Sequence, residues 1–190
     1  MDYKDSLIAL RDAASSVAVT ENLDGLKWMK KVFNSAGTEA AFLSESKLDL
    51  DTDGVTDPNI KYDPDHQGQT SIDGSADWLD ANTLNYFVLP IGFTGRHGGI
   101  RLGCLASIVY GDRIAHAIFA DSGPTDKFGE ASINVHRSLG FERVVDSKIV
   151  NVGIDNDVWI LVFIGSHIAT PCTQDEIDAA AHPLWEAMTS

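Results

Sequence analysis

Apolar and polar positions follow different patterns in the middle of this chain and at its two ends. In the middle, short apolar runs bounded by turn residues predict buried β-strands. These runs occupy residues 85–90, 105–110, 114–120 and 157–165. The second and third runs are joined by a Gly-Asp turn, which predicts a β-hairpin.

The two ends of the chain carry apolar side chains three or four positions apart, which predicts helices. At the N-terminal end this spacing covers residues 5–35 and includes a second helical stretch over 23–33. At the C-terminal end Thr173 and Glu176 form a capping box that begins a helix, which Pro183 can interrupt. Strands in the middle and helices at the ends indicate an α+β protein with a β-rich core.

The stretch 113–140 contains the most informative polar residues. Its apolar run predicts a strand that ends at Asp121, and the spacing after the following turn predicts a helix over 129–140. Asp121 and Glu130 therefore lie at opposite ends of one loop, where both carboxylates can be directed into one cleft. Hydrolysis of a glycosidic bond needs such a pair, because one acid protonates the leaving oxygen and the other activates water or attacks directly.

The segments FADSGP and GEAS around these acids resemble the catalytic segment of the glycoside hydrolase family 75 chitosanases. Further similar segments follow the same order as in that family, namely DLDTDG, DPDHQGQT, NYFVLP, LASIVYGDR and DVWILVFIG, and together they cover residues 40–175. The resemblance implies an endo-acting, inverting hydrolase of β-1,4 linkages in chitosan, with Asp121 and Glu130 as the catalytic pair. It implies no cofactor, and we expect no metal.

The Asp-Ser-Gly turn followed by a second acid also resembles the active segment of double-psi barrel proteins, including some lytic transglycosylases. This resemblance implies a six-stranded double-psi-like β-barrel with helices at its N- and C-terminal ends. We therefore divide the chain into an N-terminal helical segment, residues 1–38, and a catalytic domain, residues 39–190. Ala120 stands where the family usually has Gly, so the substrate can differ from that of other members.

Residues 47–65 carry the densest acidic cluster of the chain. Asp49, Asp51 and Asp53 precede a glycine as in a calcium loop, but Ile60 stands where an EF-hand requires Glu, and this excludes an EF-hand. Another calcium geometry stays open. The resemblance implies a strand whose acids line the substrate groove, with all three aspartates on one face as ligands of substrate amines. Solvated loop acids are the alternative.

Two hydroxyl residues, Thr70 and Ser71, match the family and are candidate hydrogen-bond partners of sugar hydroxyls. Both are also common turn residues. His97 has no second ligand at metal spacing and is interpreted as an exposed loop residue. Cys104 and Cys172 are interpreted as free thiols.

The charge balance restricts the class of partner. Fourteen basic against 28 acidic residues give a net charge of −14, which disfavours nucleic acid and suits a cationic polysaccharide, although solubility alone also explains it. No apolar run approaches the roughly 20 residues that a membrane helix needs. The first residues show no pattern of a secretory signal, whereas the resemblance implies secretion. The oligomeric state stays open.

Three functions therefore stay open: a chitosanase, an enzyme of the same fold on peptidoglycan or a β-glucan, and a cation- or polyamine-binding module without turnover. The two acids also have to be assigned roles. A helix N-terminus at Glu130 favours its ionised form and so the role of base. The analogy with transglycosylases makes it the proton donor instead, and we favour Glu130 as general acid and Asp121 as general base.

Overall fold

The computed structural model describes residues 2–60, 66–72 and 78–190. The helices are α1 (Tyr3–Asp12), α2 (Phe93–Arg96), α3 (Ile133–Ser138) and α4 (Gln174–Thr189). The strands are β1 (Ser16–Val19), β2 (Leu26–Phe33), β3 (Glu39–Asp51), β4 (Tyr86–Pro90), β5 (Leu105–Tyr110), β6 (Arg113–Gly123), β7 (Glu130–Ser132), β8 (Val144–Val145), β9 (Lys148–Ile149) and β10 (Gly153–Phe163).

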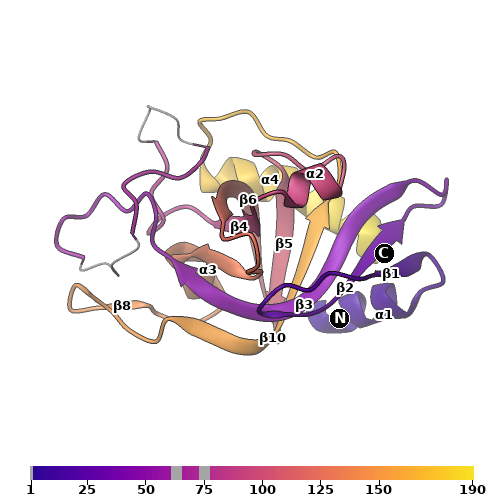
Figure 1. Ribbon diagram of the computed structural model, residues 1–190, viewed down its shortest axis with the longest axis horizontal. Helices are drawn as coiled ribbons and strands as arrows, with labels where there is room; N and C mark the ends of the chain where they lie inside the picture. Colours follow the sequence, from indigo (N-terminus) through magenta and orange to yellow (C-terminus); the bar gives the residue numbers. More distant parts are fainter. Residues whose placement is uncertain (1, 61–65, 73–77) are drawn as a thin grey trace.

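A closed six-stranded β-barrel forms the centre of the molecule (Figure 1). Its strands follow one another in the order β3, β10, β5, β6, β4 and β7, and β7 pairs back onto β3. The pairs β3–β7 and β4–β6 are parallel, and the other neighbours are antiparallel. The predicted α+β class and six-stranded barrel are therefore confirmed.

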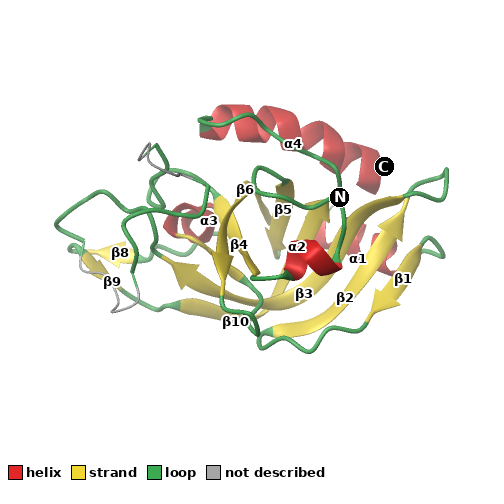
Figure 2. Ribbon diagram, turned by 45° about the horizontal axis from the view of Figure 1, so that its top comes forward, coloured by secondary structure: helices red, strands yellow, loops and turns green. Residues whose placement is uncertain are grey.

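The barrel strands are buried on both faces, so successive residues alternate between two apolar clusters. In β6, for example, Ile118 belongs to a cluster that includes α1 and α4, whereas Phe119 belongs to one that includes α2 and α3. Helix α4 packs on β5 and β6, and Figure 2 shows it lying along the outside of the barrel. This double burial explains why these strands read as continuous apolar runs in the sequence.

In the N-terminal part of the chain only α1 is helical, and the helical spacing predicted over 5–35 is already wrong at Ser16–Val19, which form β1. The prediction of a helix over 23–33 is wrong, because this stretch contains strand β2, which pairs with β1 on one side and β3 on the other. The buried side chains Met29 and Val32 are three positions apart, which fits a helix as well as an irregular strand. The pairing of this stretch with the long strand β3 favours the strand over the helix. The division of the chain at residue 38 stays a prediction, and β2 and β3 pair directly across it.

The C-terminal helix begins as predicted. Thr173 and Glu176 form the capping box of α4, and the helix continues through Pro183. The two ends of the chain meet where Tyr3 contacts Trp185 edge to face, with ring centroids 5.9 Å apart. Among the described helices none is long and apolar enough to cross a membrane.

Candidate active site

A cavity of about 440 Å³ lies where β3, β4, β6 and β7 meet. Acidic side chains from three of these strands, or from the turn after them, share it with one lysine and several apolar residues. The lining residues are Leu50, Asp51, Thr52, Asp53, Gln67, Val88, Ile91, Asp121, Ser122, Gly123, Pro124, Lys127 and Glu130.

Asp121 enters this cavity from a bulge within β6 rather than from the end of a strand. The pairing of β6 with β4 moves from Phe119 opposite Phe87 to Asp121 opposite Val88, so Ala120 is the extra residue. A bulge of this kind re-aims the side chain that follows it. The Ala120 carbonyl accepts a hydrogen bond from the Ile72 amide at 2.9 Å, which attaches the neighbouring loop to the bulge.

Ser71 holds the Asp121 carboxylate in this position. Its amide donates to Asp121 Oδ1 at 2.8 Å, and its hydroxyl donates to the same oxygen at 2.5 Å. The Ser71 hydroxyl in turn accepts from the Ser122 amide at 3.1 Å. Both donors of Ser71 are therefore directed at the acid. Thr70, the other predicted sugar-binding hydroxyl residue, is buried and does not line the cavity.

Glu130 enters the cavity from the opposite side, on the short strand β7. The predicted helix start at this residue is wrong, because α3 begins at Ile133 and its N-cap is Ser132, whose hydroxyl accepts from the Val135 amide. Residues 130–132 instead pair with β3 and β4 and complete the barrel. Glu130 consequently gains nothing from a helix dipole.

The strand pairing relates the two acids directly. Val88 on β4 lies opposite Asp121 on β6 and opposite Glu130 on β7. Neighbouring strands are about 4.8 Å apart, so the backbones of the two acids are separated by two spacings, about 9.5 Å. Residues that are partners in this way point to the same side of a sheet. Val88 therefore forms the floor between two facing carboxylates.

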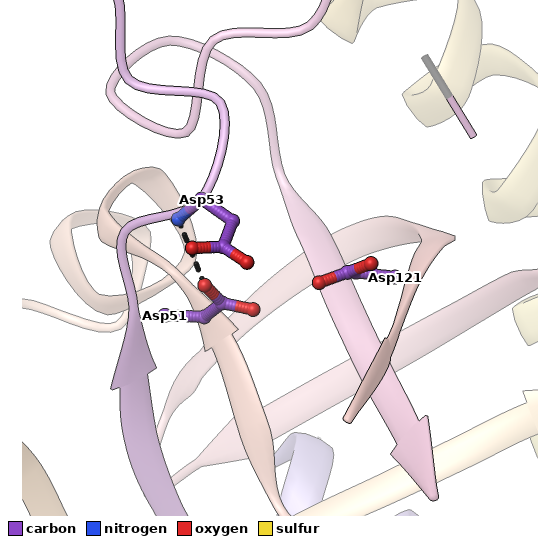
Figure 3. Close-up of side chains that lie close together, drawn as sticks. All are labelled: Asp51, Asp53 and Asp121. Carbon is purple, nitrogen blue, oxygen red and sulfur yellow. Dashed lines mark hydrogen bonds between the residues drawn. The ribbon is translucent and has the colours of Figure 1, made fainter. Parts of the chain in front are cut away.

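Three aspartates form a cluster on the Asp121 side (Figure 3). Asp51 is the last residue of β3, Asp53 follows it in the turn, and Asp121 faces both, with one carboxylate oxygen of each within 4.8 Å of the others. Asp51 accepts a hydrogen bond from the Asp53 amide at 2.8 Å. By distance these oxygens could hold a hard cation, and such clusters are also common without one.

The crowding of like charges changes the ionisation of this cluster. Burial first, and then the charges of Asp53 and Asp121, raise the pKa of Asp51 to about 8. Burial and the same carboxylates also raise the pKa of Tyr86, whose hydroxyl donates to the Asp53 carbonyl at 2.9 Å. The cluster therefore holds a proton at neutral pH.

Asp49 is separated from this cluster although it lies on the same strand. Its carboxylate pairs with Lys47 at 3.2 Å and with Lys127 at 3.0 Å, and it does not line the cavity. Lys127 also pairs with Glu130 at 2.7 Å. The structure thus brings together Asp51, Asp53, Asp121 and Glu130 around one cavity and leaves Asp49 beside it.

Comparison with protein families decides what kind of site this is. Residues 48–187 match the family described as fungal chitosanase of glycosyl hydrolase group 75. The chain belongs to this family. It is accordingly a glycoside hydrolase of the chitosanase type, with a polysaccharide such as chitosan as its substrate. No curated protein matches the chain.

The family match of this chitosanase includes every residue that lines the cavity, and it leaves out α1, β1, β2 and most of β3. Sequence reasoning missed two cavity residues that the structure places between or beside the acids. Lys127 stands three positions before Glu130, and this short spacing in the sequence was a signal that the two residues can pair. Val88 gave no signal, since it reads as one of many core residues.

Two side predictions outside the cavity have different outcomes. The exposed position expected for His97 is wrong, because the side chain is buried between Phe42 and Phe93 and its Nε2 lies 2.7 Å from the carboxylate of Glu21. Cys104 and Cys172 are free thiols, as expected.

Proposed function

We propose that the enzyme cleaves β-1,4 linkages within chitosan chains with inversion, and that Asp121 and Glu130 are its catalytic pair. The observation that carries the proposal is their common partner: both acids lie opposite Val88, from two different strands, at the floor of one cavity.

The separation of the acids supports inversion. Inverting enzymes hold their carboxyl groups about 6.5–9.5 Å apart so that a water fits between base and sugar, whereas retaining pairs stand at about 5–5.5 Å. Two strand spacings, about 9.5 Å, separate the backbones of Asp121 and Glu130, which leaves room for their carboxyl groups at the wider distance. Gly123 keeps the gap open, since a Cβ there would lie 2.7 Å from Glu130 Oε2 and 2.9 Å from Val88 Cγ1.

The surroundings of the two acids assign their roles. Lys127 pairs with Glu130 Oε1 at 2.7 Å and holds this carboxyl group in place, which suits a general base. Asp51, whose pKa is raised to about 8, has a carboxylate oxygen within 4.8 Å of one of Asp121, so a proton is available on this side of the cavity for a general acid. This assignment reverses the one favoured from the sequence by analogy with transglycosylases.

The reaction then follows in one step. Asp121 gives a proton to the glycosidic oxygen as the bond from that oxygen to the anomeric carbon breaks. A water bound near Glu130 forms the new bond to the anomeric carbon from the opposite face, and Glu130 takes its proton. Solvent returns a proton from Glu130 to Asp121 for the next cycle. Ser71 keeps the Asp121 carboxyl oriented through its two hydrogen bonds.

The charge of the molecule supports a cationic substrate. The chain carries a net charge of −14, and the cavity contains four carboxyl groups against one lysine. Ammonium groups of deacetylated chitin would be attracted to such a surface. Members of this family are typically extracellular, and we propose the same place of action.

Digestion of four polymers tests the proposal. Chitosan, chitin, cellulose and peptidoglycan are each incubated with the enzyme, and the products are identified by mass spectrometry. We expect soluble oligosaccharides of several sizes early in the digestion of chitosan, as internal cleavage requires. Proton NMR of the first products should show the α-anomer. Early release of a single short product would contradict internal cleavage, and a β-anomer would contradict inversion. Turnover of peptidoglycan alone would overturn chitosan as the proposed substrate.

A further inference from the structure

Lys127 lies in the loop that joins the two catalytic acids. Its ammonium group is 2.7 Å from Glu130 Oε1 and 3.0 Å from Asp49 Oδ2, and its side chain lines the cavity. Burial alone would lower the pKa of Lys127, but the hydrogen bonds to Glu130 and Asp49 outweigh burial, and the pKa is raised. The group is therefore a fixed positive charge beside Glu130.

A lysine is not the residue that a cationic substrate would select. Its charge repels the ammonium groups of chitosan, so contact with substrate does not explain its position. Its two ion pairs explain its position instead. Asp49 anchors the ammonium group to β3, and the second partner is Glu130. A side chain fixed at both carboxylates fixes the orientation of Glu130 as well as its charge.

The loop that carries Lys127 is itself held by the N-terminal segment. The Asp24 amide donates to the Asp126 carbonyl at 2.6 Å, and the Phe128 amide donates to the Asp24 carbonyl at 2.9 Å. These bonds form an isolated parallel bridge between Asp24 and Lys127. The Asp24 side chain also accepts from Lys47 at 2.7 Å. The family match begins at residue 48, so Asp24 lies outside it.

We infer that Lys127 is a positioning residue for Glu130 and that the N-terminal segment, through Asp24 and Gly25, holds Lys127 in place. The inference rests on the proposed role of Glu130 as general base. The charged groups that face Lys127 are Asp24 from the N-terminal segment, Asp49 and its partner Lys47 from β3, and Glu130 from β7. Asp51 is affected by the charge of Glu130 from the other side of the cavity.

Substitution of the lysine tests the first half of the inference. We expect Lys127→Met to lower kcat about 10- to 100-fold with little change in KM for chitosan, because the base loses orientation. The acidic limb of the pH–rate profile should also change, since the variant lacks the ammonium group that lies 2.7 Å from Glu130 Oε1. Lys127→Arg should restore most of the activity and the original limb. Lys148→Met, at an exposed position on β9, is the matched control.

The outcome separates this inference from the proposed function. A Lys127→Met enzyme with unchanged kcat and an unchanged acidic limb would overturn the inference, provided that Glu130→Gln is inactive in the same assay. An active Glu130→Gln enzyme would overturn the role of Glu130 itself, and with it the inference. A movement of the limb that Lys127→Arg does not reverse would also count against a charge-based role.

Substitutions of two glycines test the second half of the inference, that the N-terminal segment holds Lys127 in place. Gly25 has φ +83°, and a Cβ there would lie 2.5 Å from the Phe128 carbonyl oxygen and 2.4 Å from Lys47 Cε, so Gly25→Ala must displace the loop. Gly37 has φ +75° and nothing within 4 Å of the added carbon, so Gly37→Ala carries the same backbone strain without the displacement. We expect Gly25→Ala to lower kcat about tenfold below Gly37→Ala at a temperature where both are folded by circular dichroism. Equal kcat values would overturn the role of the N-terminal segment.

Discussion

The two sides of the cavity carry the same chemical group in opposite surroundings. On one side Asp51, Asp53 and Asp121 crowd together with their oxygens within 4.8 Å of one another, and on the other side Glu130 pairs with Lys127 at 2.7 Å. The first arrangement raises the pKa of Asp51, because this group is buried and because like charges repel. In the second arrangement a cation is in contact with Glu130.

This difference teaches how one barrel gives carboxyl groups of the same cavity different surroundings. Both sides use carboxyl groups, and the neighbours of these groups make the difference. The last residue of β3 and the turn after it supply Asp51 and Asp53, which face Asp121 (Figure 3), and the loop before β7 supplies Lys127. The consequences can be measured, and we consider the largest expected effects first.

Removal of either Asp121 or Glu130 should abolish the difference between the two sides of the cavity and, with it, nearly all hydrolysis. We expect Asp121→Asn and Glu130→Gln each to lower kcat by about a thousandfold or more, since the two residues act as a pair. The measurement is initial-rate hydrolysis of chitosan by proteins with unchanged circular dichroism spectra. Azide should restore activity to Glu130→Ala but not to Asp121→Ala, because azide replaces the attacking water. Rescue of Asp121→Ala alone would show that the roles are reversed.

A methyl group at Gly123 should fill the space between the two sides of the cavity. Its Cβ would lie 2.7 Å from Glu130 Oε2, in the gap that a water and the sugar have to share. We expect Gly123→Ala to lower kcat/KM about 100-fold while the protein remains folded. Gly98→Ala, where the added carbon meets nothing within 4 Å, is the control. Equal activity of the two variants would place the reacting water elsewhere.

The proton held by Asp51 should affect how the free energy of unfolding depends on pH. The pKa of Asp51 is raised to about 8 in the folded protein, whereas an unfolded Asp titrates near about 3.9. Between these values the folded state binds more protons than the unfolded state, so the group makes stability fall as pH rises from about 4 to about 8. We expect Asp51→Asn to remove this fall.

Thermal unfolding across this pH range checks the expectation. Asp51→Asn should have a Tm about 4 °C or more above that of the parent at pH 8, and a nearly equal Tm at about pH 4, where the parent Asp51 is neutral. A parallel pair of Tm curves would show that Asp51 is already ionised in the folded protein at low pH.

The smallest effect should come from charge outside the cavity. Attraction between a protein of net charge −14 and a cationic polymer is screened beyond about 8 Å at physiological ionic strength. We expect KM for chitosan to rise about two- to fivefold between low salt and physiological salt, with kcat unchanged. A KM that is independent of salt would leave only the contacts inside the cavity to recognise the substrate.

Local patterns in the sequence predicted those parts of the fold that depend on local structure. The hairpin of β5 and β6 follows from two apolar runs and the Gly111-Asp112 turn. The capping box at Thr173 predicted the start of α4 for the same reason. The barrel and the family came from the resemblance of motifs, and both are confirmed.

Non-local contacts account for what the sequence did not predict. Leu26–Phe33 and Glu130 are in strands because they pair with β3 and β4, and helical spacing in a single segment cannot contain that information. The bond between Ser71 and Asp121 joins residues 50 positions apart, so spacing could not show it either. Lys127 was within reach, because it stands three positions before Glu130.

The shortness of β7 has a consequence for how the enzyme becomes active. Its three residues, of which Glu130 is the first, close the barrel between β3 and β4. Contacts between segments so distant in the chain form only after a large loss of chain entropy, which makes closure a slow event in folding. A chain in which the other strands are already paired would still have no Glu130 in its cleft. Catalytic activity during refolding should therefore report the docking of this last strand, and not the earlier formation of the sheet.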